Sequence, residues 1–324
     1  MTEPLLSVEN LSMHYPVRSG FAGSTRGLLK AVDNVSFSIK SGETFGLVGE
    51  SGCGKTTTGK CVLRINEPTS GRIVFKGQDL AHASRRALAP FRRKLQLIFQ
   101  DPYSSLDPRQ TASSMLAEAI TAGGEPVSRA VLREKIAALL ATVELPEAMG
   151  RRYPHEMSGG QRQRLGIARA LACAPDLVVC DEPVAALDVS IQAQIINLFK
   201  SIQKQTGVTY LFVAHDLAVV RHISDRIGVM YLGRLVEVTT AEALYVGPRH
   251  PYTKALLSAI PITDYYEERK RSRIVLQGEV PSPMNVPPGC PFHPRCGYAT
   301  AECRIAMPEL RDIGNGHSVA CHNA

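Results

Sequence analysis

Short apolar runs recur in the first 100 residues of this chain and again between residues 177 and 238. Their length and β-branched content predict strands. We expect strands at residues 5–8, 35–39, 44–48, 71–75, 95–99, 177–180, 209–214, 227–231 and 235–238. The last two form a hairpin across Gly233-Arg234, whereas the Gly- and Ser-rich stretch 18–26 is expected to be a loop.

Between residues 108 and 145 the apolar spacing changes to that of amphipathic helices. One predicted helical face carries Met115, Leu116, Ala119 and Ile120, and a second carries Ile136, Leu139, Leu140 and Val143. We therefore expect a helical insert, at about residues 103–166, between two halves of an α/β sheet domain. Residues 162–172 and the stretch that begins at Lys55 are also expected to be helical.

The composition changes after residue 248, where prolines interrupt the chain and only residues 252–259 keep helical spacing. The length of 324 residues suggests about two domains. An apolar content of 44% is sufficient for packed cores. We expect a first domain at residues 1–248 and a small Cys-rich extension at residues 249–324.

No apolar run approaches the roughly 18 residues that span a bilayer, and the first residues lack a secretory pattern. A cytoplasmic location is therefore expected. The net charge is +7, with basic clusters at residues 85–86, 92–94 and 269–271. Solvated surface is favoured over a nucleic-acid face or an anionic membrane surface, because the chain has no Trp and no aromatics between its basic runs.

Residues 49–56, Gly-Glu-Ser-Gly-Cys-Gly-Lys-Thr, match the pattern of a phosphate-binding loop. Glycines let backbone N–H groups turn toward an anion, and the helix from Lys55 adds its positive end. Lys55 would reach the β- and γ-phosphates, and the Thr56 hydroxyl would hold Mg²⁺. The candidate nucleotide-binding residues here are Gly49, Ser51, Gly52, Gly54, Lys55, Thr56 and Thr57.

Four further candidates lie at the ends of three apolar strands, and ligands of parallel sheets bind at the carboxyl ends of strands. Asp181 ends one strand and would approach Mg²⁺, and Glu182 is the candidate general base for the attacking water. His215 would sense the γ-phosphate, and Gln100 would touch Mg²⁺ or the water. The alternatives are a capped strand end for Asp181-Glu182 and a structural role for His215.

Residues 157–161, Met-Ser-Gly-Gly-Gln, precede the basic helix. Small residues at a helix N-terminus make an anion site. Because the chain already has one phosphate loop, we expect Ser158, Gly160 and Gln161 to face the nucleotide of a second subunit. The alternative is a glycine turn that caps the helix.

Four of the eight cysteines, Cys290, Cys296, Cys303 and Cys321, lie in the last 35 residues. Disulfides are rare in the cytosol, so this cluster indicates a metal. The spacing is neither a paired zinc pattern nor a ferredoxin run, so zinc and iron–sulfur both stay open. Four reduced structural thiols are the alternative, and His293, His317 and His322 allow a Cys₃His zinc site.

These motifs, in this order over residues 1 to about 248, resemble ATP-binding cassette (ABC) transporter ATPases. The resemblance implies a P-loop NTPase fold with ATP and Mg²⁺ as ligands. It also implies that Ser158 and Gly160 contact the partner's γ-phosphate, that Asp188 communicates across the dimer, and that Tyr15 stacks on adenine. Met157 replaces the usual Leu, and Ala185 stands where Ser is frequent, which puts one contact across the dimer in doubt. No catalytic position is degenerate, so we expect ATP hydrolysis.

Residues 14–17, 153–156 and the tail around Cys290 and Cys296 resemble the second ATPase subunit of oligopeptide and dipeptide importers. This resemblance implies a [4Fe–4S] cluster held by the four tail cysteines. It implies a peripheral protein on the cytoplasmic face of the membrane that powers peptide uptake. The implied partners are a paralogous ATPase, two transmembrane permeases and an extracytoplasmic peptide-binding protein, with no nucleic acid.

Three rival interpretations remain. Nickel or glutathione importers belong to the same group, and the ATPase itself never contacts the cargo. A soluble ABC ATPase acting on DNA or ribosomes fits the basic charge, although such proteins usually carry two cassettes or a long coiled-coil insert. The tail could also act as a redox or iron sensor.

Overall fold

The computed structural model describes residues 3–19, 24–101, 105–124, 126–260 and 273–324, and it comprises two compact units. Unit 1 contains Met1–Ile39, Thr44–His82 and Ala214–Ala324. Unit 2 contains Lys40–Glu43 and Ala83–Val213. The residues after 248 therefore share a unit with the candidate phosphate loop, while the predicted domain boundary at residue 248 stays a prediction.

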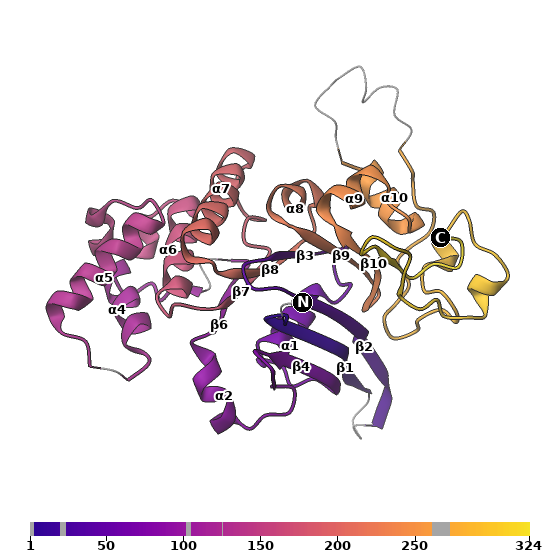
Figure 1. Cartoon of the computed structure of the whole chain (residues 1–324), viewed down its shortest axis with the longest axis horizontal. Helices are drawn as coiled ribbons and strands as arrows, with labels where there is room; N and C mark the ends of the chain where they lie inside the picture. Colours follow the sequence, from indigo (N-terminus) through magenta and orange to yellow (C-terminus); the bar gives the residue numbers. More distant parts are fainter. Residues whose placement is uncertain (1–2, 20–23, 102–104, 125, 261–272) are drawn as a thin grey trace, which may run out of the picture. The chain divides into compact units, whose positions relative to one another are not determined.

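Unit 1 has a four-stranded antiparallel sheet with the order β2-β1-β4-β5. Its strands are β1 (Leu6–Ser19), β2 (Ser24–Ile39), β4 (Ser70–Phe75) and β5 (Gln78–Asp79), as Figure 1 shows. The predicted strands at residues 5–8 and 35–39 are thus only the ends of two long strands. The prediction of a loop at 18–26 is wrong at both edges, and residues 20–23 lie outside the described residues.

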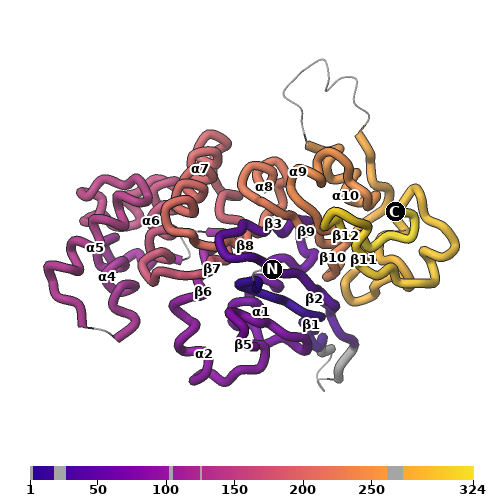
Figure 2. Tube along the Cα trace, viewed as in Figure 1, coloured from indigo at the N-terminus to yellow at the C-terminus, as the bar shows by residue number. Residues whose placement is uncertain are grey.

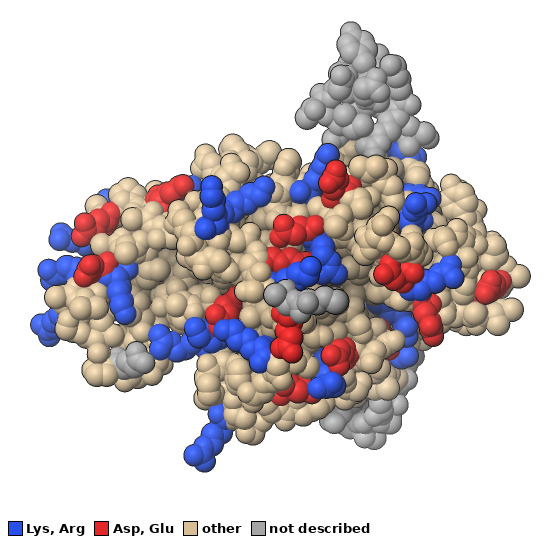
Figure 3. Space-filling model, in the orientation of Figure 1, with Lys and Arg blue, Asp and Glu red and all other residues tan. Residues whose placement is uncertain are grey.

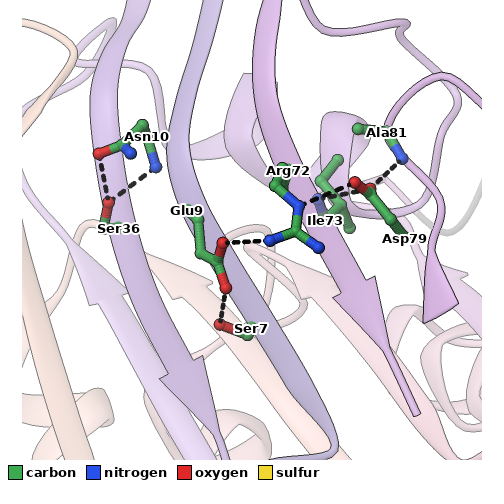
Figure 4. Close-up of polar contacts among 8 residues, drawn as sticks. All are labelled: Ser7, Glu9, Asn10, Ser36, Arg72, Ile73, Asp79 and Ala81. Carbon is green, nitrogen blue, oxygen red and sulfur yellow. Dashed lines mark hydrogen bonds and ion pairs between the residues drawn. The ribbon is translucent and has the colours of Figure 1, made fainter. Parts of the chain in front are cut away.

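The two faces of this sheet explain that error. One face is apolar and buries Leu6, Val8 and Ile73 completely or almost so. The other carries polar cross-strand contacts, such as Glu9 with Arg72 at 3.1 Å and Arg72 with Asp79 at 3.1 Å (Figure 4). A sheet with one solvated face needs no continuous apolar run, so hydrogen bonding between β1 and β2 extends the strands through polar sequence.

The second sheet region of unit 1 has the strand order β11-β12-β10-β9-β3. Its strands are β3 (Thr44–Val48), β9 (Arg226–Tyr231), β10 (Arg234–Thr240), β11 (Arg311–Asp312) and β12 (Ser318–Val319). The predicted β9–β10 hairpin is confirmed, and β3 pairs in parallel with β9. Figure 2 shows β11 and β12 beside β10, so the end of the chain extends this sheet.

The helices of unit 1 are short. They are α1 (Lys55–Val62), α8 (Leu217–Ile223), α9 (Ala241–Val246) and α10 (Pro251–Ser258), with 3₁₀ turns η3 (His293–Arg295) and η4 (Glu302–Arg304) in the tail. The helix α1 lies against β1 and β2. The helix predicted at residues 252–259 is confirmed with a shift of one residue.

Unit 2 contains three parallel strands, β6 (Leu95–Ile98), β7 (Leu177–Asp181) and β8 (Thr209–Ala214). Its helices are α2 (Arg85–Arg92), α4 (Ala112–Thr121), α5 (Arg129–Thr142), α6 (Gly159–Leu171) and α7 (Val189–Thr206), with 3₁₀ turns η1 (Glu147–Arg151) and η2 (Pro154–Glu156). Helices α4, α5 and α6 pack together (Figure 1). The predicted burial of Met115, Leu116 and Leu140 is confirmed.

The longest helix of unit 2, α7, was not predicted. It has 18 residues, and its buried face includes Ile195, Phe199 and Ile202. The Phe199 ring lies edge-on to Tyr210 and Phe212 on β8, with centroid distances of 5.3 and 5.8 Å. Such aromatic pairs add to the stabilisation from burial, so α7 is fixed by packing onto β8.

Charged side chains do not gather into one band on the face drawn in Figure 3, where basic and acidic residues of the described chain are interspersed. Of the predicted basic clusters, residues 85–86 lie in exposed positions of α2 and Lys94 pairs with Asp176 at 3.7 Å. The cluster at 269–271 lies outside the described residues. Within the parts of the chain that the structure describes, none of the helices is both long and apolar enough to span a lipid bilayer.

Candidate functional site

The candidate phosphate loop joins the carboxyl end of β3 to the start of α1, as the motif requires. Two of its glycines have no substitute. Gly54 is the N-cap of α1 with φ 106°, and a Cβ there would lie 2.1 Å from the Ala31 carbonyl oxygen. A Cβ on Gly49 would lie 2.2 Å from the Met230 carbonyl oxygen. Any side chain at either position would therefore collide with backbone.

Lys55 is 4% exposed, and its ammonium lies within the loop. Its Nζ donates to the carbonyl oxygens of Gly49 at 2.8 Å and Glu50 at 3.0 Å. Thr56 and Thr57 follow on the first turn of α1 and are half-buried, and Ser51 and Gly52 are exposed at the tip of the loop. Backbone carbonyl groups thus hold the Lys55 ammonium within the loop, where phosphate oxygens would also be acceptors.

Tyr15, the candidate for adenine stacking, belongs to the same unit as the loop, and Cys53 occupies a variable position within the loop. The Tyr15 hydroxyl on β1 accepts a hydrogen bond from Asn66 Nδ2 at 2.9 Å, and burial raises its pKa. Its stacking on adenine stays a prediction. Burial also raises the pKa of the Cys53 thiol, so Cys53 is a poor nucleophile at neutral pH.

In unit 2, Gln100 and Glu182 meet at one edge of the parallel strands. The β6–β7 register pairs Ile98 with Cys180, so the residues two positions further on emerge side by side. Gln100 Nε2 donates to Glu182 Oε2 at 2.9 Å. Asp181, which ends β7, is 8% exposed. The strand ends predict both residues at this edge, whereas their roles toward Mg²⁺ and the attacking water stay predictions.

The backbone at Glu182 is strained. Its φ is 45°, which non-glycine residues rarely adopt, and its N–H donates to the Val213 carbonyl at 2.9 Å. Strain of this kind gathers at functional sites. The bond to the end of β8 therefore holds the Glu182 carboxylate where Gln100 can reach it.

The signature residues form the start of α6. Ser158 is the N-cap, its hydroxyl accepts from the Gln161 N–H at 3.3 Å, and its own N–H donates to Gln161 Oε1 at 2.9 Å. This is a capping box, which satisfies two N–H groups of the helix start. Met157 is buried at 4% exposure, so the departure from Leu is absorbed by packing. The capping alternative is thus real, and contact with a nucleotide of a second subunit stays a prediction.

The remaining candidates are exposed. Asp188 precedes α7 as its N-cap residue but makes no side-chain cap, and Ala185 is exposed three residues before it. His215 follows β8 and is exposed, next to Asp216, which accepts from the Ala218 N–H at 2.7 Å and so caps α8. His215 belongs to unit 1, with the phosphate loop and Tyr15, whereas Gln100, Asp181, Glu182, Ser158 and Asp188 belong to unit 2.

Two residues of unit 1 that the sequence argument missed, Tyr252 and Arg295, contact Glu50 of the phosphate loop. The carboxylate of Glu50 pairs with Arg295, and the N–H of Glu50 donates to the Tyr252 hydroxyl at 2.9 Å. Arg295 is 245 residues away from Glu50 in the sequence. No local pattern signals such a pair; the only hint was that Arg295 directly precedes Cys296 in the distinctive tail motif.

The four tail cysteines are near one another. The Cys290 N–H donates to the Cys303 carbonyl at 2.8 Å. Burial raises the pKa of the Cys290 thiol to about 11, and Cys303, Cys321 and Cys296 act in the same direction. All four are free thiols. However, among the residues that the structure describes, no three His, Cys, Asp or Glu side chains are arranged to hold a metal ion.

The three histidines of the zinc alternative have other partners. His293 Nδ1 lies 2.9 Å from the Cys290 carbonyl oxygen, and His322 Nε2 lies 3.0 Å from that of Ala306. His317 Nε2 contacts the fully buried Glu237 at 2.7 Å. These contacts do not favour a histidine as the fourth ligand.

Comparison with known proteins agrees with the motifs. The profile of the family described as "ABC transporter" matches residues 32–185, and that of "Oligopeptide/dipeptide transporter, C-terminal region" matches residues 236–303. The oligopeptide transport ATP-binding protein AppF of Bacillus subtilis (strain 168) is 51% identical over 321 residues, which cover 99% of this chain and 97% of AppF. The putative oligopeptide transport ATP-binding protein YkfD of the same organism is 52% identical over 319 residues, which cover 98% of this chain and 95% of YkfD.

A solved structure confirms the fold. The dimeric structure of MJ0796, a bacterial ABC transporter cassette, is 28% identical with a TM-score of 0.65, and the match covers 73% of this chain and 98% of that one. The expected P-loop NTPase fold of the cassette type is therefore confirmed. With relatives at half identity over nearly the full chain, the protein belongs to the ABC transporter family, among the ATP-binding proteins related to oligopeptide transport.

Proposed function

We propose that this chain is the ATP-hydrolysing subunit of an importer of dipeptides or oligopeptides. The observation that carries the proposal is the Gln100–Glu182 contact of 2.9 Å at the carboxyl end of β7, in a chain that also has an intact phosphate loop. The names of the relatives, which are ATP-binding proteins of oligopeptide transport, supply the class of cargo.

In this proposal the residues of one chain divide the work. Lys55 and the loop N–H groups bind the phosphates, and Thr56, Asp181 and Gln100 hold Mg²⁺, which neutralises charge on the phosphate oxygens. Glu182 accepts a proton from the water that attacks the γ-phosphorus, and ADP leaves with the electrons of the broken P–O bond. His215 contacts the γ-phosphate and reports its loss.

A second ATPase completes each site in the proposed assembly. Ser158, Gly160 and Gln161 of one subunit would contact the nucleotide bound to the phosphate loop of the other, and Asp188 would connect the two sites. The expected second subunit is a paralogue. Two transmembrane permeases and an extracytoplasmic peptide-binding protein would complete an importer on whose cytoplasmic face this chain lies. Residues 1–248 would be the nucleotide-binding domain, with the insert at about 103–166.

Other cargoes and activities have less support. Nickel or glutathione import would use the same ATPase chemistry, but the two relatives named above are oligopeptide transport proteins. The names of these two relatives describe transport rather than action on nucleic acid. Identification of the binding protein that co-purifies with the assembly, and of its ligand, tests the cargo.

The Glu182→Gln variant tests the chemistry. We expect unchanged ATP affinity and at least a hundredfold slower phosphate release, because an amide cannot accept the proton. The matched control is Glu134→Gln, which removes an exposed carboxylate on α5 of the same unit and should hydrolyse ATP normally. Turnover that survives in the Glu182→Gln variant would reject Glu182 as the base.

We also propose that Cys290, Cys296, Cys303 and Cys321 hold a [4Fe–4S] cluster in the extension at residues 249–324. Four clustered thiols are a donor set that soft metals prefer. The thiols would have to reorient on binding, because no three of the described His, Cys, Asp or Glu side chains are arranged to hold a metal ion. Thiols with raised pKa lose protons when they bind a metal, so binding should strengthen as pH rises.

Anaerobic purification followed by assays of iron, sulfide and zinc tests the cluster. We expect about four iron and four sulfide per chain with visible absorbance, and loss of both in Cys296→Ser. The control Cys173→Ser changes a half-buried thiol outside the tail and should keep the metal. If the assays find one zinc per chain, the four cysteines form a zinc site rather than a cluster. If they find neither metal, the cysteines are four reduced thiols.

A further inference from the structure

All the polar groups of one phosphate-loop residue, Glu50, are held by other residues. Its carbonyl oxygen accepts from Lys55 Nζ at 3.0 Å. Its backbone N–H donates to the Tyr252 hydroxyl at 2.9 Å. Its two carboxylate oxygens accept from the two terminal nitrogens of Arg295 at 2.8 and 3.1 Å. Only the first of these partners belongs to the loop motif.

The Arg295 contact has the strong geometry of ion pairs. A guanidinium that faces a carboxylate with two parallel N–H groups fixes both distance and orientation. The Arg295 side chain is 8% exposed and that of Glu50 is 27% exposed, so solvent screens the pair only in part. Glu50 is the main cause that raises the pKa of Arg295, so the arginine stays charged at every pH of interest.

Tyr252 and Arg295 are themselves held in place. The rings of Tyr231, Tyr252 and Phe292 form an aromatic cluster with centroid distances of 4.8, 5.3 and 5.4 Å. Tyr252 is fully buried, and burial is the first cause that raises its pKa, so its hydroxyl stays protonated. Arg295 ends the turn η3, two residues before Gly297 and three after Phe292 of the cluster.

We propose that Tyr252 and Arg295 are positioning residues for the phosphate loop, which they hold through Glu50. The inference rests on the proposed binding of ATP at this loop. A loop whose first residues are fixed before the ligand arrives loses less conformational entropy on binding. The C-terminal extension therefore contributes directly to nucleotide affinity, although it contains no phosphate ligand.

The test measures ATP affinity on the full-length chain and turnover on that chain assembled with its partner ATPase. Arg295→Gln removes the ion pair, and we expect about tenfold weaker binding of ATP, with turnover at saturating ATP changed by less than about twofold. The matched control is Arg304→Gln, which removes an exposed arginine from the same tail and should bind ATP as the unaltered chain does. Arg295→Lys keeps the positive charge but loses the two parallel N–H donors of the guanidinium. Its ATP affinity should therefore lie between those of Arg295→Gln and Arg304→Gln.

Two further variants separate positioning from general stability. Glu50→Gln breaks the same ion pair from the loop side and leaves the tail intact, and Tyr252→Phe removes one hydroxyl but keeps the aromatic packing. We expect each to weaken ATP binding without lowering the unfolding midpoint in proportion. The double variant Glu50→Gln/Arg295→Gln should bind ATP no more weakly than the worse single variant, because both remove one interaction.

If Arg295→Gln and Glu50→Gln both bind ATP with an affinity within twofold of that of the unaltered chain, this inference is overturned. The proposed function would then stay intact. Equal losses in Arg295→Gln and Arg304→Gln would also overturn it, because the effect would then be one of net charge. An assembly of the unaltered chain with its partner ATPase that binds ATP but does not hydrolyse it would instead contradict the proposed function, while the affinity comparison would still decide the role of Arg295.

Discussion

The phosphate loop and the signature segment both place glycines at the N-terminus of a helix, and they are held in opposite ways. The signature is held locally: Ser158 and Gln161, three residues apart, exchange two hydrogen bonds. The phosphate loop is held from a distance: Glu50 contacts Tyr252 and Arg295, which are 202 and 245 residues away. One segment therefore depends on its own sequence, and the other depends on the folding of the C-terminal extension.

The largest effect in this comparison is expected from Gly54→Ala. The new methyl group would lie 2.1 Å from the Ala31 carbonyl oxygen at a φ of 106°, so the loop must move. We expect ATP binding to weaken at least a hundredfold, as measured by nucleotide titration. The matched change Gly166→Ala, on α6 where nothing lies within 4 Å, should leave binding unchanged and stabilise the helix by about 0.5–1 kcal/mol. Normal binding by Gly54→Ala would show that the loop needs no left-handed glycine there.

A second effect comes from His250, which connects the extension to β10. Burial lowers its pKa to about 3, its N–H donates to Glu237 at 3.0 Å, and its Nδ1 accepts from the Tyr252 N–H at 3.1 Å. Unfolded His titrates near pH 6.5, so the unfolded chain binds more protons between pH 6.5 and 3. The free energy of unfolding should therefore fall by up to about 1.4 kcal/mol per pH unit as pH drops from about 6 to 4.

Denaturant unfolding at several pH values checks this slope. His250→Asn keeps an acceptor for the Tyr252 N–H but does not titrate, so the dependence between pH 6 and 4 should become flatter. The matched control is His82→Asn, an exposed histidine in the same unit, which should keep the original slope. An unchanged slope in His250→Asn would contradict the role of His250.

The smallest effect is expected from a change in the signature segment, which is held by its own residues. Ser158→Ala removes the acceptor for the Gln161 N–H and should lower the free energy of unfolding by about 1 kcal/mol. Because the hydrogen bonds of the cap join only Ser158 and Gln161, we expect ATP affinity of the isolated chain to stay the same while turnover of the assembled pair falls. If the isolated Ser158→Ala chain binds ATP more weakly than the unaltered chain, the cap also affects the nucleotide site of its own chain, which would contradict this prediction.

The elements that carry chemistry could be predicted because their causes are local. Short apolar runs predicted β3 and β7, and the strand-end rule placed Gln100 and Glu182 at one edge of the sheet. The β1 and β2 strands were predicted too short, because sheet pairing rather than an apolar run extends them through polar sequence. The helix α7 was missed although its apolar residues Ile195, Phe199 and Ile202 have helical spacing and Gly207 ends it.

The support of the site could not be predicted for a related reason. Glu50 occupies a variable position of the loop motif, and nothing in the neighbouring residues indicates that its partner is Arg295. The tail motif indicated a metal through its cysteines, whereas its arginine and the aromatic residues Phe292 and Tyr252 carry the contacts to the loop. Long-range pairs of this kind become visible only in the folded chain.

The central claim is that each ATP is bound by the phosphate loop of one subunit and the signature of another. The most direct measurement is a structure of the Glu182→Gln chain with its partner ATPase and ATP in the closed state. The account predicts hydrogen bonds from the Ser158 hydroxyl and the Gly160 N–H of one subunit to the γ-phosphate on the other. A closed assembly in which residues 158–161 lie away from every triphosphate would contradict it.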